Sequence, residues 1–302
     1  MRDPLEYAAA WMFLKFLRLL PRPAARRTAA LTAALFFRIR PSLRRAADFN
    51  LHLAFPDWSE SERRRAIRAM IRNIGRMAAE FARFPSYSRQ NMERAIVLEN
   101  FENFAAAEKR GKGVLLLTGH MGAWELAPFA HALFSRPLHF LVRPVENSHV
   151  DRLISAYRCL SGNRPIAKNE SARAVLRVLR EGGVVGILAD QNTMPEEAIF
   201  VDFFGLPAAT TTGIARLARQ TGAAVVPAYS YWDRSLGKYR LHYEPELALT
   251  RTGDEQADIY ANTALFNRVM EDYIRRFPDQ WLWVHKRWKT RPPGERALYS
   301  DQ

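Results

Sequence analysis

The sequence predicts an α/β protein with a mostly parallel sheet that is flanked by helices. From about Arg94 onward, short apolar runs typical of strands alternate with amphipathic runs typical of helices, and this alternation favours parallel strands covered on both faces. The apolar runs at 113–119 and 184–190 are unbroken, as expected for strands buried on both sides. The length of 302 residues suffices for one large domain with an added helical segment.

Residues 1–45 are predicted to be helices that associate with a membrane. Segment 6–20 carries aromatic residues and leucines with two cations, and segment 26–45 is a second apolar stretch bracketed by arginines. Rings and leucines can enter the acyl boundary of a bilayer while the cations meet lipid phosphates. Neither segment has the roughly 20 apolar residues of a spanning helix, and we expect no secretory signal. The alternative is a pair of helices that pack on the main domain.

Residues 46–302 are predicted to be a single domain that opens on a long helix. Ser59 and Glu62 fit a capping box, and apolar residues then recur at helical spacing as far as Phe81. We expect this apolar face to lie in the core or against lipid. Glycines stop two later helices, and segment 238–246 alternates like the edge strand of a hairpin. The remaining expected elements are strands at 95–99, 113–119, 138–144, 184–190 and 223–232, and helices at 100–110, 126–134, 145–160, 172–183, 213–222 and 254–276.

Composition limits the classes of function. Lys and Arg number 45 against 31 Asp and Glu, a net charge of +14, which favours acidic partners such as nucleic acid, an anionic membrane or an acidic protein. The one cysteine, Cys159, excludes a disulfide within the chain and a cysteine-based zinc site, and it fits a buried small residue better than a nucleophile. No histidine spacing predicts a metal, and we expect no cofactor.

The strongest local candidate for chemistry is His120 with Glu125. His120 follows the strand at 113–119, and sites in parallel α/β sheets form beyond the carboxyl ends of strands. Two residues that are five positions apart on one helix point about 140° away from each other. A histidine in the turn and a glutamate one turn into the helix could nevertheless meet. Gly119 and Gly122 suit a tight turn with close approach of a substrate. The alternative, a core histidine beside an ordinary surface carboxylate, stays open at this point.

Several blocks of the chain resemble the bacterial lipid A late acyltransferases, within the glycerolipid acyltransferase superfamily. The stretch GHMGAWE at 119–125 resembles the family's His-four-residues-acid motif, and further blocks follow in the family's order across about 48–292. Met121, Ala123 and Ala189 depart from common residues of these motifs, which puts substrate identity in doubt more than chemistry. The other matching blocks are LVRP, ENSHVDRLI, GILADQN, FVDFFGLPAATTTGIARLA, VVPAYSYW and WLWVHKRWKTRP.

The resemblance implies acyl transfer from a thioester, on acyl carrier protein, to a hydroxyl of a lipid A precursor. His120 would be the general base and Glu125 would orient and charge-stabilise it. No covalent acyl-enzyme is needed, which fits the lack of a GxSxG motif. The expected place is the cytoplasmic face of the inner membrane, with the chain lying on the bilayer.

Other candidates for substrate binding lie at strand ends and near the C-terminus. Arg143 could bind an acceptor phosphate or neutralise an oxyanion. Asp190, with Gln191 beside it, could hold Arg143 or a sugar hydroxyl, or form a structural ion pair.

Phe203, Phe204 and Gly205 are expected to shape the pocket wall, and Thr210 to Thr212 to cap the next helix. In the segment 281–288, His285 and Arg287 alternate with Trp283 and Trp288 as in a strand. This pattern predicts cations toward the cleft, near a lipid head group, and rings toward the core.

Three alternatives stay open. The same chemistry could act on another glycolipid or phospholipid, such as a phosphatidylinositol mannoside. A basic nucleic-acid-binding protein is disfavoured because the charge is spread along the chain and no recognition motif is present. A non-catalytic homologue is opposed by the intact His120 and Glu125.

Overall fold

A seven-stranded sheet with helices on both faces forms the centre of the computed structural model, which describes residues 2–142, 144–167, 171–195 and 198–299. The strand order is β1-β9-β8-β2-β5-β3-β4. Strands β8, β2, β5, β3 and β4 run parallel, whereas β9 pairs antiparallel with β8 and parallel with β1. The strands are β1 Ile96–Glu99, β2 Val114–Thr118, β3 His139–Val142, β4 Arg164–Ala167, β5 Val184–Leu188, β8 Ala224–Asp233 and β9 Lys238–Tyr243.

The expectation of a mostly parallel sheet is confirmed. Strand β9 forms the predicted hairpin with β8, but β1 pairs on its other side, so β9 does not lie at the edge. Strand β4 and a separate antiparallel hairpin of β6 and β7 were not expected. The hairpin strands are β6 Ala198–Phe203 and β7 Leu206–Thr211.

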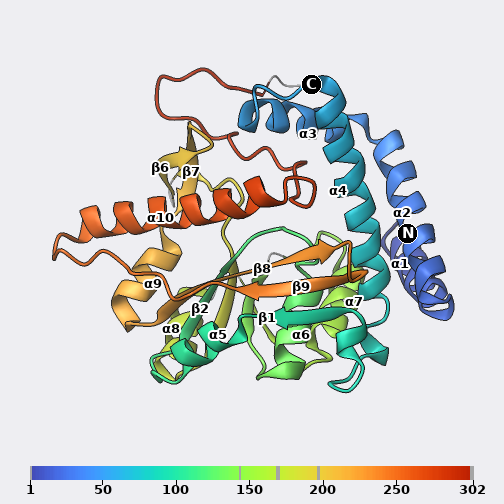
Figure 1. Ribbon diagram of the computed structural model, residues 1–302, viewed down its shortest axis with the longest axis horizontal. Helices are drawn as coiled ribbons and strands as arrows, with labels where there is room; N and C mark the ends of the chain where they lie inside the picture. The colour runs from blue at the N-terminus through green and yellow to red at the C-terminus, as the bar shows by residue number, and fades with distance from the viewer. Residues whose placement is uncertain (1, 143, 168–170, 196–197, 300–302) are drawn as a thin grey trace.

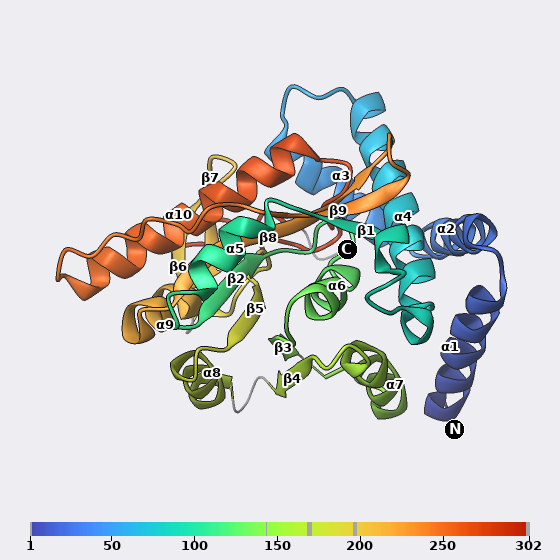
Figure 2. The same cartoon turned by 60° about the horizontal axis from the view of Figure 1, so that its bottom comes forward.

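The helices cover the sheet in two layers with separate hydrophobic cores. Leu116 of β2 lies in the core shared with α5, α6 and α7, whereas Leu115 and Leu117 lie in the core shared with α8, α9 and α10. Figure 1 shows α10 on one side of the sheet and α5 and α6 on the other, and Figure 2 shows α6 and α7 beside β3 and β4. These helices are α5 Phe101–Glu108, α6 Leu126–Phe134, α7 Ser148–Cys159, α8 Ser171–Arg180, α9 Gly213–Thr221 and α10 Glu255–Arg276.

Helix α4, Glu60–Phe81, connects the two layers. Its Ser59 cap and Glu62 form the predicted capping box, and its apolar face lies in the protein core: Ile67 and Met70 join one hydrophobic cluster and Met77 the other. Short 3-10 turns at Phe84–Ser86 and Met92–Arg94 lead from α4 into β1.

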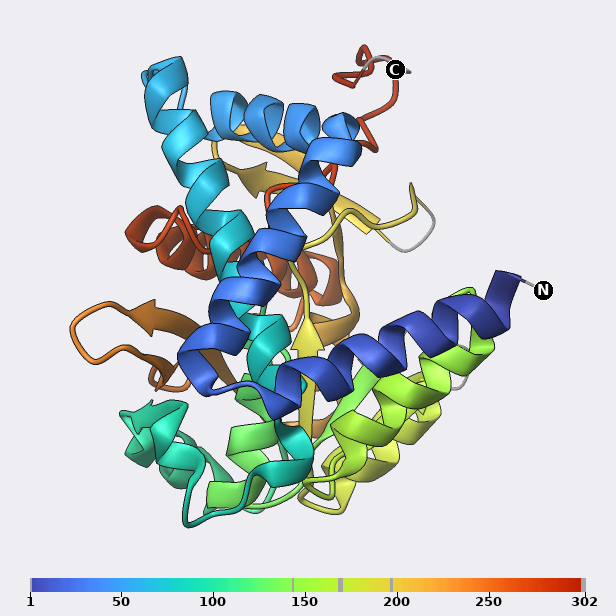
Figure 3. The same ribbon diagram turned by 90° about the vertical axis from the view of Figure 1, so that its right-hand side faces the viewer.

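Three N-terminal helices precede α4: α1 Arg2–Leu19, α2 Arg22–Ile39 and α3 Pro41–Ala54. Figure 3 shows α2 beside α4 and α1 beside α7. The contact between α2 and α4 is close, since a Cβ placed on Gly75 would lie 2.4 Å from the Cα of Ala30. Within the described part of the chain, no helix has the length and apolar character needed to cross a bilayer. The predicted boundary between residues 45 and 46 falls inside α3, and membrane association of 1–45 stays a prediction.

The segment 281–288 is a run of turns and bends, not the strand that its alternation predicted. Trp283 and Trp288 are fully buried, as expected of the rings. The segment bonds to separate elements instead of to one neighbouring strand: the indole of Trp288 donates to Phe203 of β6, and the carbonyl of His285 accepts from Asn50 of α3.

Candidate active site

His120 and Asp190 lie side by side because two neighbouring strands end in register. Strands β2 and β5 are parallel, with Thr118 paired to Leu188, so the residues two positions beyond each strand leave the sheet together. Nδ1 of His120 lies 2.9 Å from Oδ1 of Asp190. The backbone N–H of His120 donates to Oδ2 of the same carboxylate at 2.6 Å. The partner of the histidine ring is therefore a carboxylate from the adjacent strand end.

The environment of Asp190 keeps its carboxylate charged. Asp190 is 1% exposed, and the indole Nε1–H of Trp281 donates to its Oδ2 at 2.7 Å. Burial favours the neutral acid, but the attraction of His120 and the hydrogen bonds from His120 and Trp281 outweigh it and lower the pKa of Asp190 to about 2. The carboxylate is thus ionised throughout the physiological pH range.

The same pairing sets the state of His120. Burial acts to lower its pKa, but the charge and hydrogen bond of Asp190, with a smaller contribution from Glu125, raise the pKa above the ordinary 6.5. Because Nδ1 faces Asp190, Nε2 is the ring nitrogen left for chemistry. The amide nitrogen of Gln191 lies 3.3 Å from each ring nitrogen, and the ring of Trp124 lies edge-on with centroids 5.5 Å apart.

Two glycines around His120 are required by close protein contacts. A Cβ on Gly119 would lie 2.9 Å from Oδ2 of Asp190, and one on Gly122 would lie 2.0 Å from the carbonyl oxygen of Ser230. Gly122 also has a positive φ of +59°. The sequence predicted close approach of a substrate here. The atoms that approach are those of Asp190 and Ser230.

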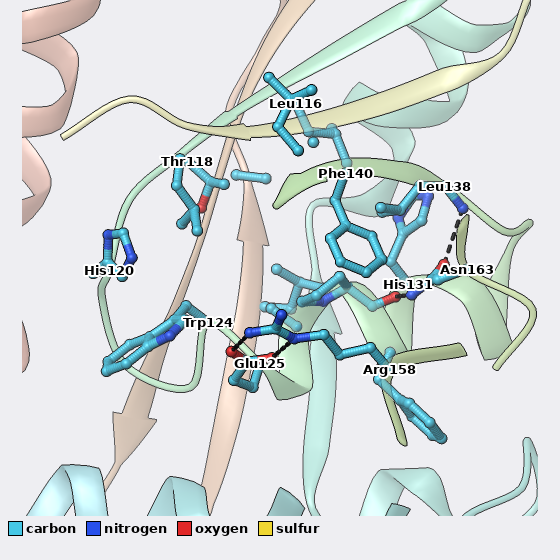
Figure 4. Close-up of a pocket in the computed structure, with 18 of the residues that line it drawn as sticks. Leu116, Thr118, His120, Trp124, Glu125, His131, Leu138, Phe140, Arg158 and Asn163 are labelled. Atoms are coloured by element: carbon cyan, nitrogen blue, oxygen red, sulfur yellow. Dashed lines mark hydrogen bonds and ion pairs between the residues drawn. The ribbon is translucent and has the colours of Figure 1, made fainter. Parts of the chain in front are cut away.

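Glu125 does not contact the ring of His120, contrary to the prediction that it orients the histidine. It stands at the N-cap position of α6 without a side-chain cap hydrogen bond, and its carboxylate accepts from Arg158 of α7, whose Nε lies 2.8 Å from Oε2 and whose Nη2 bonds the other oxygen. Figure 4 shows this pair turned away from His120. The reason is the position of Glu125, which stands just before the first residue of α6 and not one turn inside the helix. In addition, Asp190 already occupies Nδ1 of His120.

His120 and Glu125 nevertheless line one cavity, with a volume of about 280 Å³. The cavity lies between one face of the sheet and helices α6 and α7, and Figure 4 shows His120 and the charged Glu125–Arg158 pair on its wall. Most of the other side chains in its wall are apolar, including Leu116, Phe140 and Leu188. A largely apolar cavity with a histidine at one end suits a ligand that has a hydrocarbon chain and a reactive head.

The Asp190 carboxylate binds His120 and Trp281, and its predicted contact with Arg143 or a sugar hydroxyl stays a prediction. Arg143 itself lies outside the described residues. Gln191 lies at the site as predicted, against the histidine ring.

Phe204 and Gly205 form the turn of the β6–β7 hairpin and not a wall of the cavity. Their φ angles of 57° and 78° fit a two-residue turn of type I′. The backbone N–H of Phe204 donates to Oε2 of Glu271 at 2.7 Å, and its ring packs on Phe55 and Trp283. The expectation that they shape the pocket is wrong because the hairpin packs on α10.

His285 and Arg287 also lie away from the cavity. Nε2 of His285 accepts the backbone N–H of Asn192 at 2.9 Å and so supports the loop that follows Asp190. Arg287 is fully buried; its guanidinium donates to the carbonyl of Ala209 and to Thr210, each at 2.7 Å, and burial lowers its pKa to about 10. The prediction that Arg287 faces the cleft is wrong, because these hairpin oxygens bind it inside the core.

Sequence reasoning missed two members of the site, Trp281 and Arg158. The donor to Asp190 comes from a segment 91 residues further along the chain, so no local pattern marks it. Arg158 belongs to a helix that the sequence did predict, but its partner Glu125 is 33 residues away.

A parallel α/β sheet with a histidine–carboxylate pair at its strand ends, beside an apolar cavity, fits an enzyme whose substrate carries an apolar chain. The family model described as bacterial lipid A biosynthesis acyltransferase matches residues 2–290. The chain therefore belongs to that family and is an acyltransferase of lipid A biosynthesis.

Individual relatives agree with this assignment. The lipid A biosynthesis palmitoleoyltransferase of Escherichia coli (strain K12) is 30% identical over 264 residues, which are 86% of this chain and 84% of the relative. The lauroyltransferase of the same strain is 27% identical over 298 residues, covering 97% of this chain and 95% of the relative. A lipid A biosynthesis acyltransferase of Haemophilus influenzae is 25% identical, with 96% and 90% covered.

Proposed function

We propose that this protein moves a fatty acyl group from acyl carrier protein to a hydroxyl of a lipid A precursor at the cytoplasmic face of the inner membrane. The observation that carries the proposal is the His120–Asp190 pair on an apolar cavity, in a chain of the lipid A acyltransferase family. The net charge of +14 supports two acidic partners, the phosphorylated lipid and the carrier protein.

In the proposed reaction, Nε2 of His120 takes the proton of the acceptor hydroxyl as its oxygen attacks the thioester carbonyl. The carbon–sulfur bond then breaks, the thiolate leaves with the proton that His120 returns, and the acyl group remains on the acceptor as an ester. Asp190 holds the ring through Nδ1 and stabilises its protonated form, the role that an orienting carboxylate plays in catalytic triads. A general base of this kind contributes roughly 10²–10⁴ in rate.

We propose direct transfer with no covalent acyl-enzyme. The cavity wall, as far as the described residues form it, includes neither serine nor cysteine. Cys159 lies outside that wall, and burial raises the pKa of its thiol, which lowers the fraction of reactive thiolate.

Glu125 and Arg158 take a supporting role in this proposal. The Glu125 carboxylate adds to the raised pKa of His120, and its ion pair fixes the Arg158 guanidinium on the cavity wall. Arg143 stays the predicted cation for an acceptor phosphate, and Gln191 is proposed to contact the acceptor beside the ring.

We propose that α1 and α2 bring the chain to the membrane. Exposed apolar side chains include Trp11 and Phe16 of α1 and Leu31 of α2, with cations such as Lys15 among them, as interfacial binding requires. Arg22 and Arg26 instead form ion pairs with the buried Glu80. Deleting residues 1–45 would expose Glu80, so the sharper test is Trp11→Ser with Phe16→Ser. The double variant should no longer bind liposomes that contain anionic lipid. If as much of the variant as of the wild type sediments with these liposomes, the membrane anchor lies elsewhere.

The deciding experiment incubates the full-length protein with acyl carrier protein charged with a fatty acid and with a lipid A precursor. Mass spectrometry should show one acyl group added to the precursor, and His120→Ala should not add it. Parallel reactions with acyl coenzyme A and with a phosphatidylinositol mannoside test the donor and the acceptor. Transfer to the mannoside alone, or full activity of His120→Ala, would overturn the proposal.

A further inference from the structure

The cavity runs along one face of the sheet, away from His120 and toward the amino ends of the strands. On β2 and β5, residues two positions apart line the cavity, as expected for one face of a sheet. These residues are Leu116 and Thr118 of β2 and Gly186 and Leu188 of β5. Figure 4 shows His120 at one end, with Leu138, His131 and Asn163 at the other. Burial increases in the same direction, since Leu188 is 40% exposed whereas Leu138 is 2% exposed. The cavity is therefore open near His120 and closed at its far end.

The closed end is formed by a neutral pair of rings. Nδ1 of His131 lies 2.8 Å from the hydroxyl of Tyr243, and both side chains are buried. Burial lowers the pKa of His131 to about 3, so its ring carries no charge at neutral pH. The side chain of Asn163 accepts a hydrogen bond from the backbone N–H of Leu138 and donates one to the carbonyl of Pro128. Among the described residues that line this end of the cavity, none carries a charge at neutral pH, and the two rings close it to an apolar chain.

Gly186 lies between the two ends. Its register partners are Leu116 on one side and Phe140 on the other, and both of these side chains line the cavity. A Cβ built on Gly186 would point to the same face, where its nearest neighbour is Cδ1 of Leu138 at an ordinary 3.7 Å. Gly186 is not among the glycines with positive φ, so a larger residue is compatible with the backbone. Gly186 lines the cavity without a side chain, and the surroundings leave room for at least a Cβ there.

We propose that this cavity holds the acyl chain of the donor and that Gly186 sets the longest chain accepted. The inference rests on the proposed function: with the thioester carbon at His120, the chain must extend from there into apolar surroundings. A side chain at position 186 would occupy the space between the open end and the His131–Tyr243 stop. Pockets of this kind discriminate one methylene by roughly 10- to 200-fold in kcat/KM, so a few atoms at Gly186 change the preferred chain.

The test compares Gly186→Ala and Gly186→Val with the wild-type protein on acyl carrier proteins charged with saturated chains of increasing length. We expect the preferred chain to shorten in both variants, more with valine. The value of kcat/KM for the longest chain that the wild type uses should fall by roughly 10- to 200-fold, and that for the shortest chain should hold. Gly213→Ala is the matched control, because Gly213 starts α9 and lies outside the cavity.

A second measurement needs no turnover: calorimetric binding of free fatty acids to the full-length chain. Gly186→Val should lose affinity for long acids and keep it for short ones, whether or not the wild type proves to acylate a lipid A precursor. If the wild type transfers acyl groups but the variants keep its chain-length profile, the inference is wrong while the proposed function stands. An equal rise in the acceptor KM with every donor would instead place an acceptor chain in the cavity and overturn it. Gly186→Ala decides the matter if the valine variant does not fold.

Discussion

Two histidine–carboxylate pairs in this protein arise from the same feature of parallel strands, and they lie in different surroundings. His242 of β9 and Glu99 of β1 are direct register partners, with Nδ1 and Oε2 2.7 Å apart. His120 and Asp190 stand two residues beyond a register pair of β2 and β5, with their atoms 2.9 Å apart. By distance alone, either pair would pass for a catalytic dyad.

The surroundings separate them. The Glu99 side chain is 27% exposed and is shared with Arg240 and the hydroxyl of Tyr231. Asp190 is buried, and within the described part of the chain His120 and Trp281 are its hydrogen-bond partners. The ring of His242 packs on Tyr229, whereas His120 lines the apolar cavity.

The comparison teaches that position along the strand decides the use of such a pair. Within the strands, the histidine is held among its neighbours and the pair contributes to cross-strand contact. Beyond the carboxyl ends, the chain turns away and one ring nitrogen can meet a ligand.

The largest expected effect is the difference between His120→Ala and His242→Ala. Removing the proposed base should lower kcat by roughly 10²–10⁴, with the fold retained by circular dichroism. His242→Ala removes the same atoms from the other pair and should keep most of the activity. Comparable losses of kcat in both variants would show that the position of His120 beyond the strand end gives it no special part in the reaction.

Asp190→Asn should be the next most damaging change and should move the pH profile. The base works when neutral, so activity is present above the pKa of His120 and is lost as the pH falls through it. That pKa is raised above 6.5 by the Asp190 charge against the effect of burial, so the wild-type limb lies above 6.5. Without the charge the limb should shift to lower pH while kcat also falls. Glu99→Gln, the matched change, should leave the limb in place.

Much of the fold was predictable from the sequence, and the site only in part. The apolar runs 113–119 and 184–190 identify β2 and β5 and place His120 and Asp190 at strand ends. They do not say that these strands are neighbours, because sheet order depends on packing between segments some 70 residues apart. Glu125, close in sequence, was therefore assigned the contact that Asp190 makes.

The misplaced Arg287 has a similar cause. The sequence placed this cation toward the cleft and not in the core, since burying a charge without partners is costly. The carbonyl of Ala209 and the hydroxyl of Thr210 meet it in the core, and neither is recognisable as its partner from local sequence.

A smaller effect is expected for Glu125→Gln. This variant tests how much the charge of a carboxylate near His120 contributes when that carboxylate does not bind the histidine ring. Glu125 acts on His120 only through its charge and binds Arg158. We expect kcat to fall roughly tenfold, about 1.4 kcal/mol, with a slight shift of the pH limb downward. Glu246→Gln, which breaks the outlying pair with Arg110, is the control. A loss as large as that of Asp190→Asn would identify Glu125 as the carboxylate on which His120 depends.

The last comparison concerns the other donors to the two carboxylates, and it tests burial through the stability of the fold instead of through activity. Tyr231→Phe removes the hydroxyl 3.1 Å from Glu99, but water and Arg240 can replace it at this partly exposed group. We expect the free energy of unfolding in urea to change by about 0.5 kcal/mol. Trp281→Phe removes the 2.7 Å hydrogen bond to buried Asp190, where no solvent replaces it, and should cost about 1.5–3 kcal/mol.

The pH dependence of stability separates this hydrogen bond from lost packing. Because the pKa of Asp190 is lowered from 3.8 to about 2, its stabilising contribution is present above 3.8 and is lost as the pH falls through about 2. Without the indole donor that pKa rises, so Trp281→Phe should unfold at a higher pH during acid titration. Trp283→Phe removes an equally buried ring whose indole donates to the carbonyl of Pro278 instead. If both variants shifted the acid midpoint equally, packing and not the carboxylate would explain the loss.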